Sequence, residues 1–271
     1  MAETAFICTT CGTQYPPSSD PPRSCPICED ARQYVNPLGQ EWITLAEMRQ
    51  THFNAYRAYA PGLTGVGTMP HFAIGQRALL VRTPEGNVLW DCISFLDQGT
   101  IEIVRALGGI AAIAISHPHY YTTMVEWSRA FGAAVYLHEA DRKWVMRPDP
   151  CLAFWGGETR PILPGLTLIR AGGHFPGGTV LHSESHRALL AGDITQVGPD
   201  QHVSFMWSYP NLIPLDAASV RRIARALEPY DFDSIYGAFW GKEIFRDGKA
   251  VLARSVERYL RAISTPRVEE N

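Results

Sequence analysis

Residues 110–121 read Ile110-Ala-Ala-Ile-Ala-Ile-Ser-His-Pro-His-Tyr-Tyr121, an apolar run that ends in two histidines. An uninterrupted apolar run of this length is typical of a parallel strand that is buried on both faces. Open α/β sheets place their chemistry at the carboxyl ends of such strands. Residues i and i+2 of an extended chain project to the same side, and Pro118 stiffens the backbone between His117 and His119. The stretch therefore predicts half of a metal site, with two solvated loop histidines as the alternative.

Length and composition bound the class of protein. A chain of 271 residues accommodates one large domain and a small appendage, and 46% apolar with 19% charged residues describes a soluble globular protein. The net charge of −3 gives no electrostatic case for binding nucleic acid or an anionic membrane. No apolar run approaches the ~20 residues that span a bilayer, and the N-terminus lacks the pattern of a secretory signal. We therefore expect a cytoplasmic protein whose partner is a small-molecule substrate, and the sequence leaves its oligomeric state open.

Four of the six cysteines form two pairs, Cys8-x2-Cys11 and Cys25-x2-Cys28, with 13 residues between the pairs. Paired cysteines in a reducing cytosol indicate metal binding more strongly than disulfides. The two pairs resemble the knuckles of a zinc ribbon or rubredoxin, and the proline-rich loop between them is too polar to bury a core, so metal would supply most of the folding free energy. We predict a four-cysteine module over residues 1–35. A structural or docking zinc is favoured, and a redox-active iron is the alternative because the same thiolates hold either metal.

The rest of the chain alternates strand and helix patterns. Thr44 and Glu47 predict a capping box at the start of a helix over 44–53, whereas the glycine-rich residues 60–67 predict a loop. A hairpin is expected where Pro84-Glu-Gly-Asn87 separates two apolar runs. Further helices are predicted over residues 98–107, 122–131, 140–146, 216–227 and 249–263, and further strands over 134–137, 160–170, 179–182, 187–191 and 233–236.

Two later positions extend the candidate metal site. His174 lies in Ala171-Gly-Gly-His-Phe-Pro-Gly-Gly178, where glycines allow the backbone to approach a ligand closely. Asp193 follows the buried run Ala188-Leu-Leu-Ala191. Asp91 closes another strand, and two roles are open for it: a hydrogen bond to a metal-bound imidazole, or a plain structural role.

His117-x-His119, the Gly-x-His174-x-Pro-Gly loop and strand-Gly192-Asp193, in this order, resemble the metallo-β-lactamase superfamily over roughly residues 40–260. The resemblance implies an α/β fold, a four-layer αββα sandwich, for residues 36–271. It also implies that the three histidines bind one metal ion. The superfamily's usual Asp-His pair corresponds to Tyr121 and Thr122, and no histidine follows His202 to serve as the usual last ligand.

These departures remove most ligands of a second ion, so we predict a mononuclear centre with Asp193 as fourth ligand or proton acceptor. Asp193 would act as the base, with Tyr120 or Tyr121 donating a hydrogen bond to the oxyanion. Aromatic residues after Asp193 either wall the substrate pocket or pack in the core. The pocket candidates are Phe205, Trp207, Tyr209 and Trp240.

The function that this resemblance favours is a metal-dependent hydrolase in which a metal-bound water attacks an ester, thioester, lactone or amide. We expect one catalytic and one structural zinc, with iron as a possible occupant of either site. One alternative is a non-haem iron oxidoreductase resembling a sulfur dioxygenase, with the four-cysteine module as electron carrier. A second alternative is a binding protein with a degenerate metal site.

Overall fold

The apolar run before the two histidines forms strand β8 (Ala112–Ala114), which lies inside a seven-stranded sheet. It pairs in parallel with its neighbours on both sides, as an all-apolar strand predicts. The other strands of this first sheet, in spatial order from one edge to the other, are β10 (Leu152–Trp155), β9 (Ala134–His138), then beyond β8 the strands β7 (Gly86–Trp90), β6 (Arg77–Thr83), β5 (Leu63–Met69) and β4 (Phe53–Ala60).

The computed structural model describes residues 3–264. In it, a second sheet of six strands faces the first. Its strands in spatial order are β11 (Thr159–Leu163), β12 (Leu166–Arg170), β13 (Thr179–Ser183), β14 (Ala188–Gly192), β19 (Ser234–Gly237) and β20 (Glu243–Ile244). The predicted pairing of 179–182 with 187–191 is confirmed as the antiparallel β13–β14 ladder.

Alternation along the strands divides the core into layers. In β6, Leu79 and Val81 pack between the two sheets, whereas Leu80 packs on the outer, helix-covered face. Because successive strand residues point to opposite faces, a strand buried on both sides reads as continuously apolar. In β14, Leu190 likewise faces the other sheet and Leu189 faces helices. The predicted four-layer αββα sandwich is confirmed.

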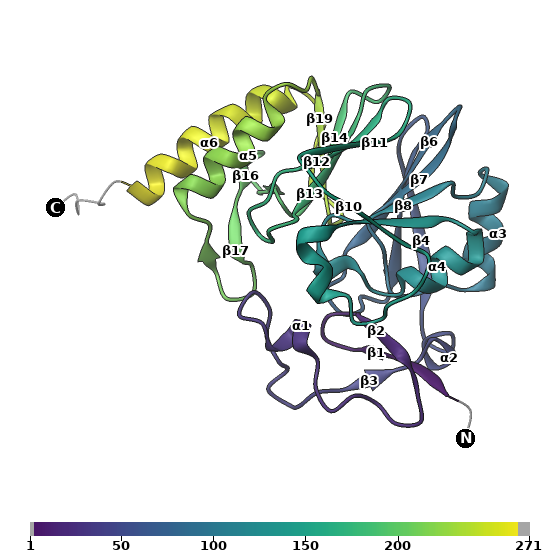
Figure 1. Ribbon diagram of the computed structural model, residues 1–271. Helices are drawn as coiled ribbons and strands as arrows, with labels where there is room; N and C mark the ends of the chain where they lie inside the picture. The colour runs from purple at the N-terminus through teal and green to yellow at the C-terminus, as the bar shows by residue number, and fades with distance from the viewer. Residues whose placement is uncertain (1–2, 265–271) are drawn as a thin grey trace.

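Helices close the outer faces of both sheets (Figure 1). On the first sheet these are α3 (Gln98–Ala106) and α4 (Met124–Phe131), and on the second they are α5 (Ala217–Leu227) and α6 (Gly248–Ser264). Asp216 caps α5, since its side chain accepts hydrogen bonds from the amides of Ala218 and Ser219. None of the helices within residues 3–264 is long and apolar enough to cross a membrane.

The N-terminal module lies across one end of the sandwich, near the bottom of Figure 1. Its strands β2 (Gln14–Ser18) and β1 (Thr4–Cys8) form a small sheet with β3 (Trp42–Ile43), which follows the module and precedes the short helix α2 (Leu45–Met48). In the second cysteine pair, Cys25 precedes α1 (Pro26–Glu29) and Cys28 lies within it. The Gln14 amide donates to the carbonyl of Thr122 at 3.2 Å, directly after the two-histidine motif. The module is therefore joined to the part of the sandwich that carries the predicted site.

Two segments between the module and the first hairpin differ from expectation. The predicted helix over 44–53 stops at Met48, although its capping box is present, and the predicted loop over 60–67 is mostly strand β5. Glycines suggested a loop, but a Cβ on Gly67 would lie 2.7 Å from the ring of Trp240. Glycine is needed here so that the indole can pack against the strand, whereas in the sequence the same glycine suggests a loop.

Short irregular elements complete the chain. The predicted helix over 140–146 is the 3-10 segment η2 (Glu139–Trp144). Two small hairpins, not predicted, follow Asp193: β15 (Gln196–Val197) with β16 (Val203–Ser204), and β17 (Met206–Ser208) with β18 (Ile213–Pro214).

Candidate metal centre

Three buried histidines converge at the end of the sandwich that the module covers. His117 caps the 3-10 turn η1 (Pro118–Tyr120), which contains His119, and His174 lies on the glycine-rich loop between β12 and β13. One ring nitrogen from each lies within 4.8 Å of the others, and each side chain is nearly inaccessible to solvent. The sequence prediction that these three side chains meet is thus matched by the geometry.

Hydrogen bonding orients His174 for a ligand role. Its Nδ1 lies 2.7 Å from the carbonyl oxygen of Trp207, which only accepts, so Nδ1 carries the proton. Its Nε2 then carries a lone pair, and this nitrogen lies 3.1 Å from Nδ1 of His119. Two nitrogens bound to one tetrahedral ion at about 2.0–2.1 Å lie about 3.3 Å apart, so the pair has nearly the spacing that one cation requires.

Several polar atoms here lack hydrogen-bond partners among residues 3–264: Nε2 of His117, Nε2 of His119 and Oδ1 of Asp193. Burial lowers the pKa of His117 and His119 well below the usual range, and lowers that of His174 to about 4. Neutral imidazoles with unused nitrogens are the form that a metal ion binds. The residues therefore fit a divalent cation.

Asp193 follows β14 and approaches the same centre. Its Oδ1 lies 3.4 Å from Nε2 of His117, while its Oδ2 accepts a hydrogen bond from the hydroxyl of Tyr120 at 3.0 Å. Tyr209 donates to its backbone carbonyl at 2.5 Å. Burial raises the pKa of Asp193 to about 7, against the lowering effect of the Tyr120 hydrogen bond. One carboxylate oxygen is thus held in place and the other faces a histidine.

Supporting contacts fix the two loops that carry the histidines. Asp91 accepts from the Ser116 amide at 2.8 Å, so it anchors the backbone before His117 rather than an imidazole. Gly173 adopts φ +85°, a conformation that favours glycine, just before His174. Asp141 accepts from the Gly177 amide at 2.9 Å on the far side of that loop.

A cavity of about 320 Å³ opens beside His119, His174 and Asp193. Tyr209 lines it, as predicted, but most of the lining was not anticipated because it comes from distant segments. Residues of the module, of the β5–β6 loop and of the chain after β19 contribute, among them Arg32, Gln33, Tyr34, His71, Ile74 and Phe239. His71 belonged to no motif, so no sequence signal marked it.

Three of the four aromatic pocket candidates lie elsewhere. Phe205 is buried in the core beneath α5 and α6, and Trp240 stacks on Tyr59 against strand β5. Trp207 contributes its backbone carbonyl to His174 rather than its ring to the cavity wall. The residue beside Trp240, Phe239, lines the cavity instead.

The two tyrosines of the motif also differ from expectation. Tyr120 is fully buried and its hydroxyl is engaged by Asp193. Tyr121 is 2% exposed and packs in the apolar cluster that contains Met124, Val125 and Trp127 of α4. Neither residue lines the cavity, so the predicted oxyanion hydrogen bond from either hydroxyl has no support in this arrangement.

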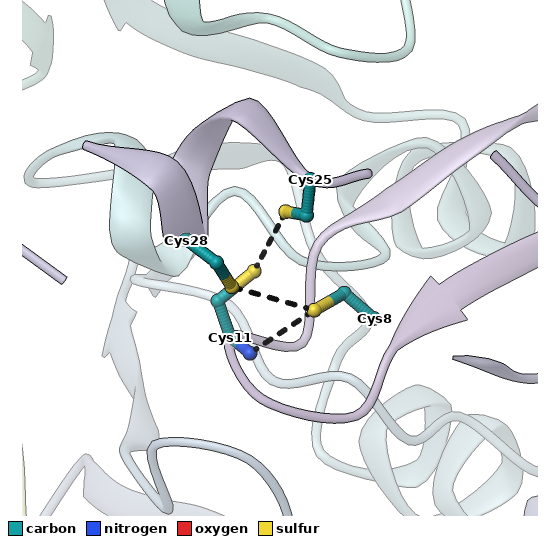
Figure 2. Close-up of side chains that lie close together, drawn as sticks. All are labelled: Cys8, Cys11, Cys25 and Cys28. Atoms are coloured by element: carbon teal, nitrogen blue, oxygen red, sulfur yellow. Dashed lines mark hydrogen bonds between the residues drawn. The ribbon is translucent and has the colours of Figure 1, made fainter. Parts of the chain in front are cut away.

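The four cysteines of the module form a second buried cluster, with their sulfur atoms turned toward one another (Figure 2). The Sγ atoms of Cys8 and Cys28 are 3.6 Å apart, as are those of Cys11 and Cys25. Thiolates bound to one tetrahedral zinc at about 2.3 Å lie about 3.8 Å apart, so this cluster fits a single ion. Tyr15 donates to Sγ of Cys25 at 3.1 Å, which supports a charged thiolate.

Known proteins show similar sequence and structure. A family model described as the metallo-beta-lactamase superfamily matches residues 73–239. The uncharacterized protein YmaE of Bacillus subtilis (strain 168) is 49% identical over 267 residues, which cover 96% of this chain and 97% of that protein. The crystal structure of VMB-1 has a TM-score of 0.61 at 12% identity, covering 78% of this chain and 98% of VMB-1. The metallo-beta-lactamase FIM-1 from Pseudomonas aeruginosa, in its mono-zinc form, has a TM-score of 0.56 at 16% identity, covering 76% of this chain and 95% of FIM-1. At these identities the two structures show the fold.

Proposed function

The chain belongs to the metallo-β-lactamase superfamily, and from that premise we propose that it hydrolyses a small carbonyl compound with one metal ion held by His117, His119 and His174. Superfamily membership and the three-histidine cluster support a metal-dependent hydrolase. The observation that carries the finer proposal is the convergence of three buried imidazoles beside a cavity that His119, His174 and Asp193 line. Three protein ligands with a remaining open position are typical of catalytic zinc.

The surroundings of the centre favour one ion over two. Thr122 is buried, its carbonyl accepts from the Gln14 amide, and its methyl group lies close to Gly12 of the module. Phe239, just after β19, lines the cavity where the superfamily resemblance implies a last histidine. Within residues 3–264, no second group of three or more ligand side chains adjoins the three histidines. The mono-zinc form of FIM-1 is a precedent for one ion in this fold.

Asp193 is the residue best placed to handle protons. A divalent ion in the histidine site supplies Lewis acidity and lowers the pKa of bound water. Tyr120 holds Oδ2 of Asp193, so Oδ1 remains to accept a proton from a nucleophilic water and to return it to the leaving group. Tyr209 fixes the backbone of Asp193 at the same time. The carboxylate is therefore both buried and oriented.

The cavity limits the class of substrate. About 320 Å³ suits a small molecule, and Ile74, Tyr209 and Phe239 provide an apolar wall. Gln33 and Gln196 supply amide groups for polar substituents. We propose an ester, thioester, lactone or amide with an apolar portion as the substrate.

Replacing Asp193 tests this assignment. The Asp193→Asn protein is expected to lose about 10²–10⁴-fold in kcat on any ester, thioester, lactone or amide that the wild type turns over, since it lacks the proton acceptor. Tyr120→Phe is expected to lose about 10–100-fold because Asp193 is no longer held. Tyr121→Phe removes a hydroxyl from the same turn, but in the core, and serves as the matched control. Full turnover by Asp193→Asn would contradict the proposal.

Metal content measured on the same proteins separates the loss of a base from the loss of the ion. Native mass spectrometry of the wild type is expected to find two ions per chain, one for each ligand cluster. Asp193→Asn should keep both if the carboxylate acts as a base, and lose one if it is an essential ligand. A coloured iron-loaded protein would instead favour the oxidoreductase alternative, because four thiolates bind iron as well as zinc.

A further inference from the structure

Arg32 reaches from the four-cysteine module into the histidine centre. Its Nε and Nη2 donate to the two carboxylate oxygens of Asp30 at 2.6 and 2.9 Å, and its Nη1 donates to the carbonyl of His174 at 3.3 Å. Arg32 is 8% exposed, so its charge is buried, and the side chain of its partner Asp30 is partly buried at 20% exposed. A residue of the module thus holds the backbone of a candidate metal ligand in the sandwich.

Phe175 extends this contact to the other two histidines. Its ring is 1% exposed, and its centroid lies 5.5, 4.9 and 5.0 Å from the rings of His117, His119 and His174. The guanidinium carbon of Arg32 lies 3.9 Å from the centroid of the same ring. Cation–π attraction of this kind strengthens when water is excluded. Arg32 therefore holds the ring against which all three imidazoles pack.

The cysteine cluster in turn fixes Arg32. Arg32 lies four positions after Cys28, just beyond the short helix α1 that begins after Cys25 and contains Cys28. Asn211, between β17 and β18, donates to the carbonyls of Ala31 and Gln33 at 3.0 Å each, so both neighbours of Arg32 are also braced by the sandwich. The short path from the thiolates to the guanidinium leaves little freedom once an ion holds the cysteines.

Asp30 makes a buried cation compatible with a neighbouring metal ion. An unpaired guanidinium beside the histidines would repel a dication, and the repulsion is strong where water is excluded. Arg32 donates hydrogen bonds to both carboxylate oxygens of Asp30, so its positive charge is paired with a negative one and the pair is neutral overall. Arg32 is thus able to position the site without opposing metal binding.

We propose that Arg32 is a positioning residue for the histidine metal site, and that the four-cysteine module sets the geometry of that site through Arg32 and Phe175. This inference rests on the proposed binding of an ion by the three histidines. It adds that the module, besides holding its own cysteine cluster, positions residues of the catalytic centre. Removing a group that contacts a metal ligand typically lowers metal affinity by about 10–100-fold.

The test uses the full chain with zinc in the cysteine cluster and cobalt titrated into the histidine site. Arg32→Ala is expected to bind cobalt about 10–100-fold more weakly, with an altered visible spectrum. Asp30→Asn, which leaves the arginine charge uncompensated, should weaken binding in the same direction. Arg32→Lys keeps the charge but loses the bidentate pair, so an intermediate affinity is expected. Arg23→Ala, an exposed arginine of the same module, is the control and should bind as the wild type does.

Thermal unfolding and the zinc content of the cysteine cluster are measured on each variant, so that a folding defect is recognised. If Arg32→Ala does not fold, Asp30→Asn and Arg32→Lys decide the question. The inference would be overturned if folded Arg32 and Asp30 variants bound cobalt within twofold of the wild-type affinity and gave an unchanged visible spectrum. A wild type that binds no ion at the histidines would instead overturn the proposed function, which keeps the two failures distinct.

Discussion

Asp141 is a buried carboxyl group that supports the His174 loop from outside the cavity. Its Oδ1 accepts from the Gly177 amide, and it is 1% exposed. A Cβ on Gly177 would lie 2.6 Å from its other carboxylate oxygen, which explains why glycine is needed there. Asp141 therefore acts on the loop that carries a candidate ligand.

This group gives the protein a pH-dependent stability. Burial raises the pKa of Asp141 from 3.8 to about 6, so the folded chain holds this proton more tightly than the unfolded chain does. The stabilisation that this proton gives the folded chain is complete below about pH 4 and is lost as the pH rises through about 6. It amounts to at most about 3 kcal/mol in the free energy of unfolding. Asp141→Asn keeps the acceptor for Gly177 without titrating.

Denaturant unfolding of both proteins between pH 4 and 7 measures this effect. The free energy of unfolding of the wild type minus that of Asp141→Asn should fall with rising pH across this window. Subtracting the variant cancels the acid response that both proteins share. A difference that is flat with pH, or that rises, would show that Asp141 is not held in its protonated form.

Residues with a motif around them were predictable, and residues without one were not. His117, His119, His174 and Asp193 follow strands or glycine-rich loops, where local pattern indicates chemistry. Arg32 and His71 reach the cavity only because distant segments fold together. Single-sequence patterns carry no information about such contacts, and aromatic content alone does not tell which face a ring takes.

At the level of elements, β6 and β20 are tied by a buried ion pair that joins the two sheets. Nη2 of Arg77 lies 2.8 Å from Oε1 of Glu243, with side-chain exposures of 0% and 4%. Arg77 also donates to the hydroxyl of Tyr59 at 2.9 Å. Removing one member of a buried pair leaves an uncompensated charge, which is more harmful than losing the attraction itself.

Glu243→Ala is therefore expected to lower the free energy of unfolding by about 3–5 kcal/mol. Asp231→Ala breaks an ion pair with Lys249 in which the side chains of Asp231 and Lys249 are 83% and 44% exposed, and it should change stability far less because water screens this pair. Urea unfolding of the two variants beside the wild type makes the comparison. If both variants lost the same free energy of unfolding, Arg77 would have found another partner or become hydrated.

Strands buried on both faces were the elements most readily predicted, because continuous apolar runs such as that in β14 have few other interpretations. Strand β5 was read as a loop since Gly65 and Gly67 suggested one. Those glycines leave space for the ring of Trp240, which lies more than 170 positions later in the chain. Element type therefore failed where a tertiary contact, rather than local conformation, chose the residue.

Across the whole molecule, the module and the sandwich share their hydrophobic cores. The buried cysteine cluster packs against Ile74 and Trp144 of the sandwich. Ile7 of β1 packs with Phe95, which precedes α3. The sequence predicted a separate module, and this sharing of core residues is what a linear pattern does not reveal.

Cooperative unfolding follows from that shared core. Binding of a structural zinc by four thiolates supplies about 10–16 kcal/mol in isolated zinc-finger peptides, and that energy is folding energy. A Cys25→Ser/Cys28→Ser variant should therefore unfold at a lower temperature in a single transition that includes the sandwich. An independent module would instead melt alone and leave the main transition unchanged. Calorimetry, with tryptophan fluorescence recorded in parallel, separates these outcomes. Cys151→Ser, a cysteine outside the cluster, is the control that should leave the transition close to that of the wild type.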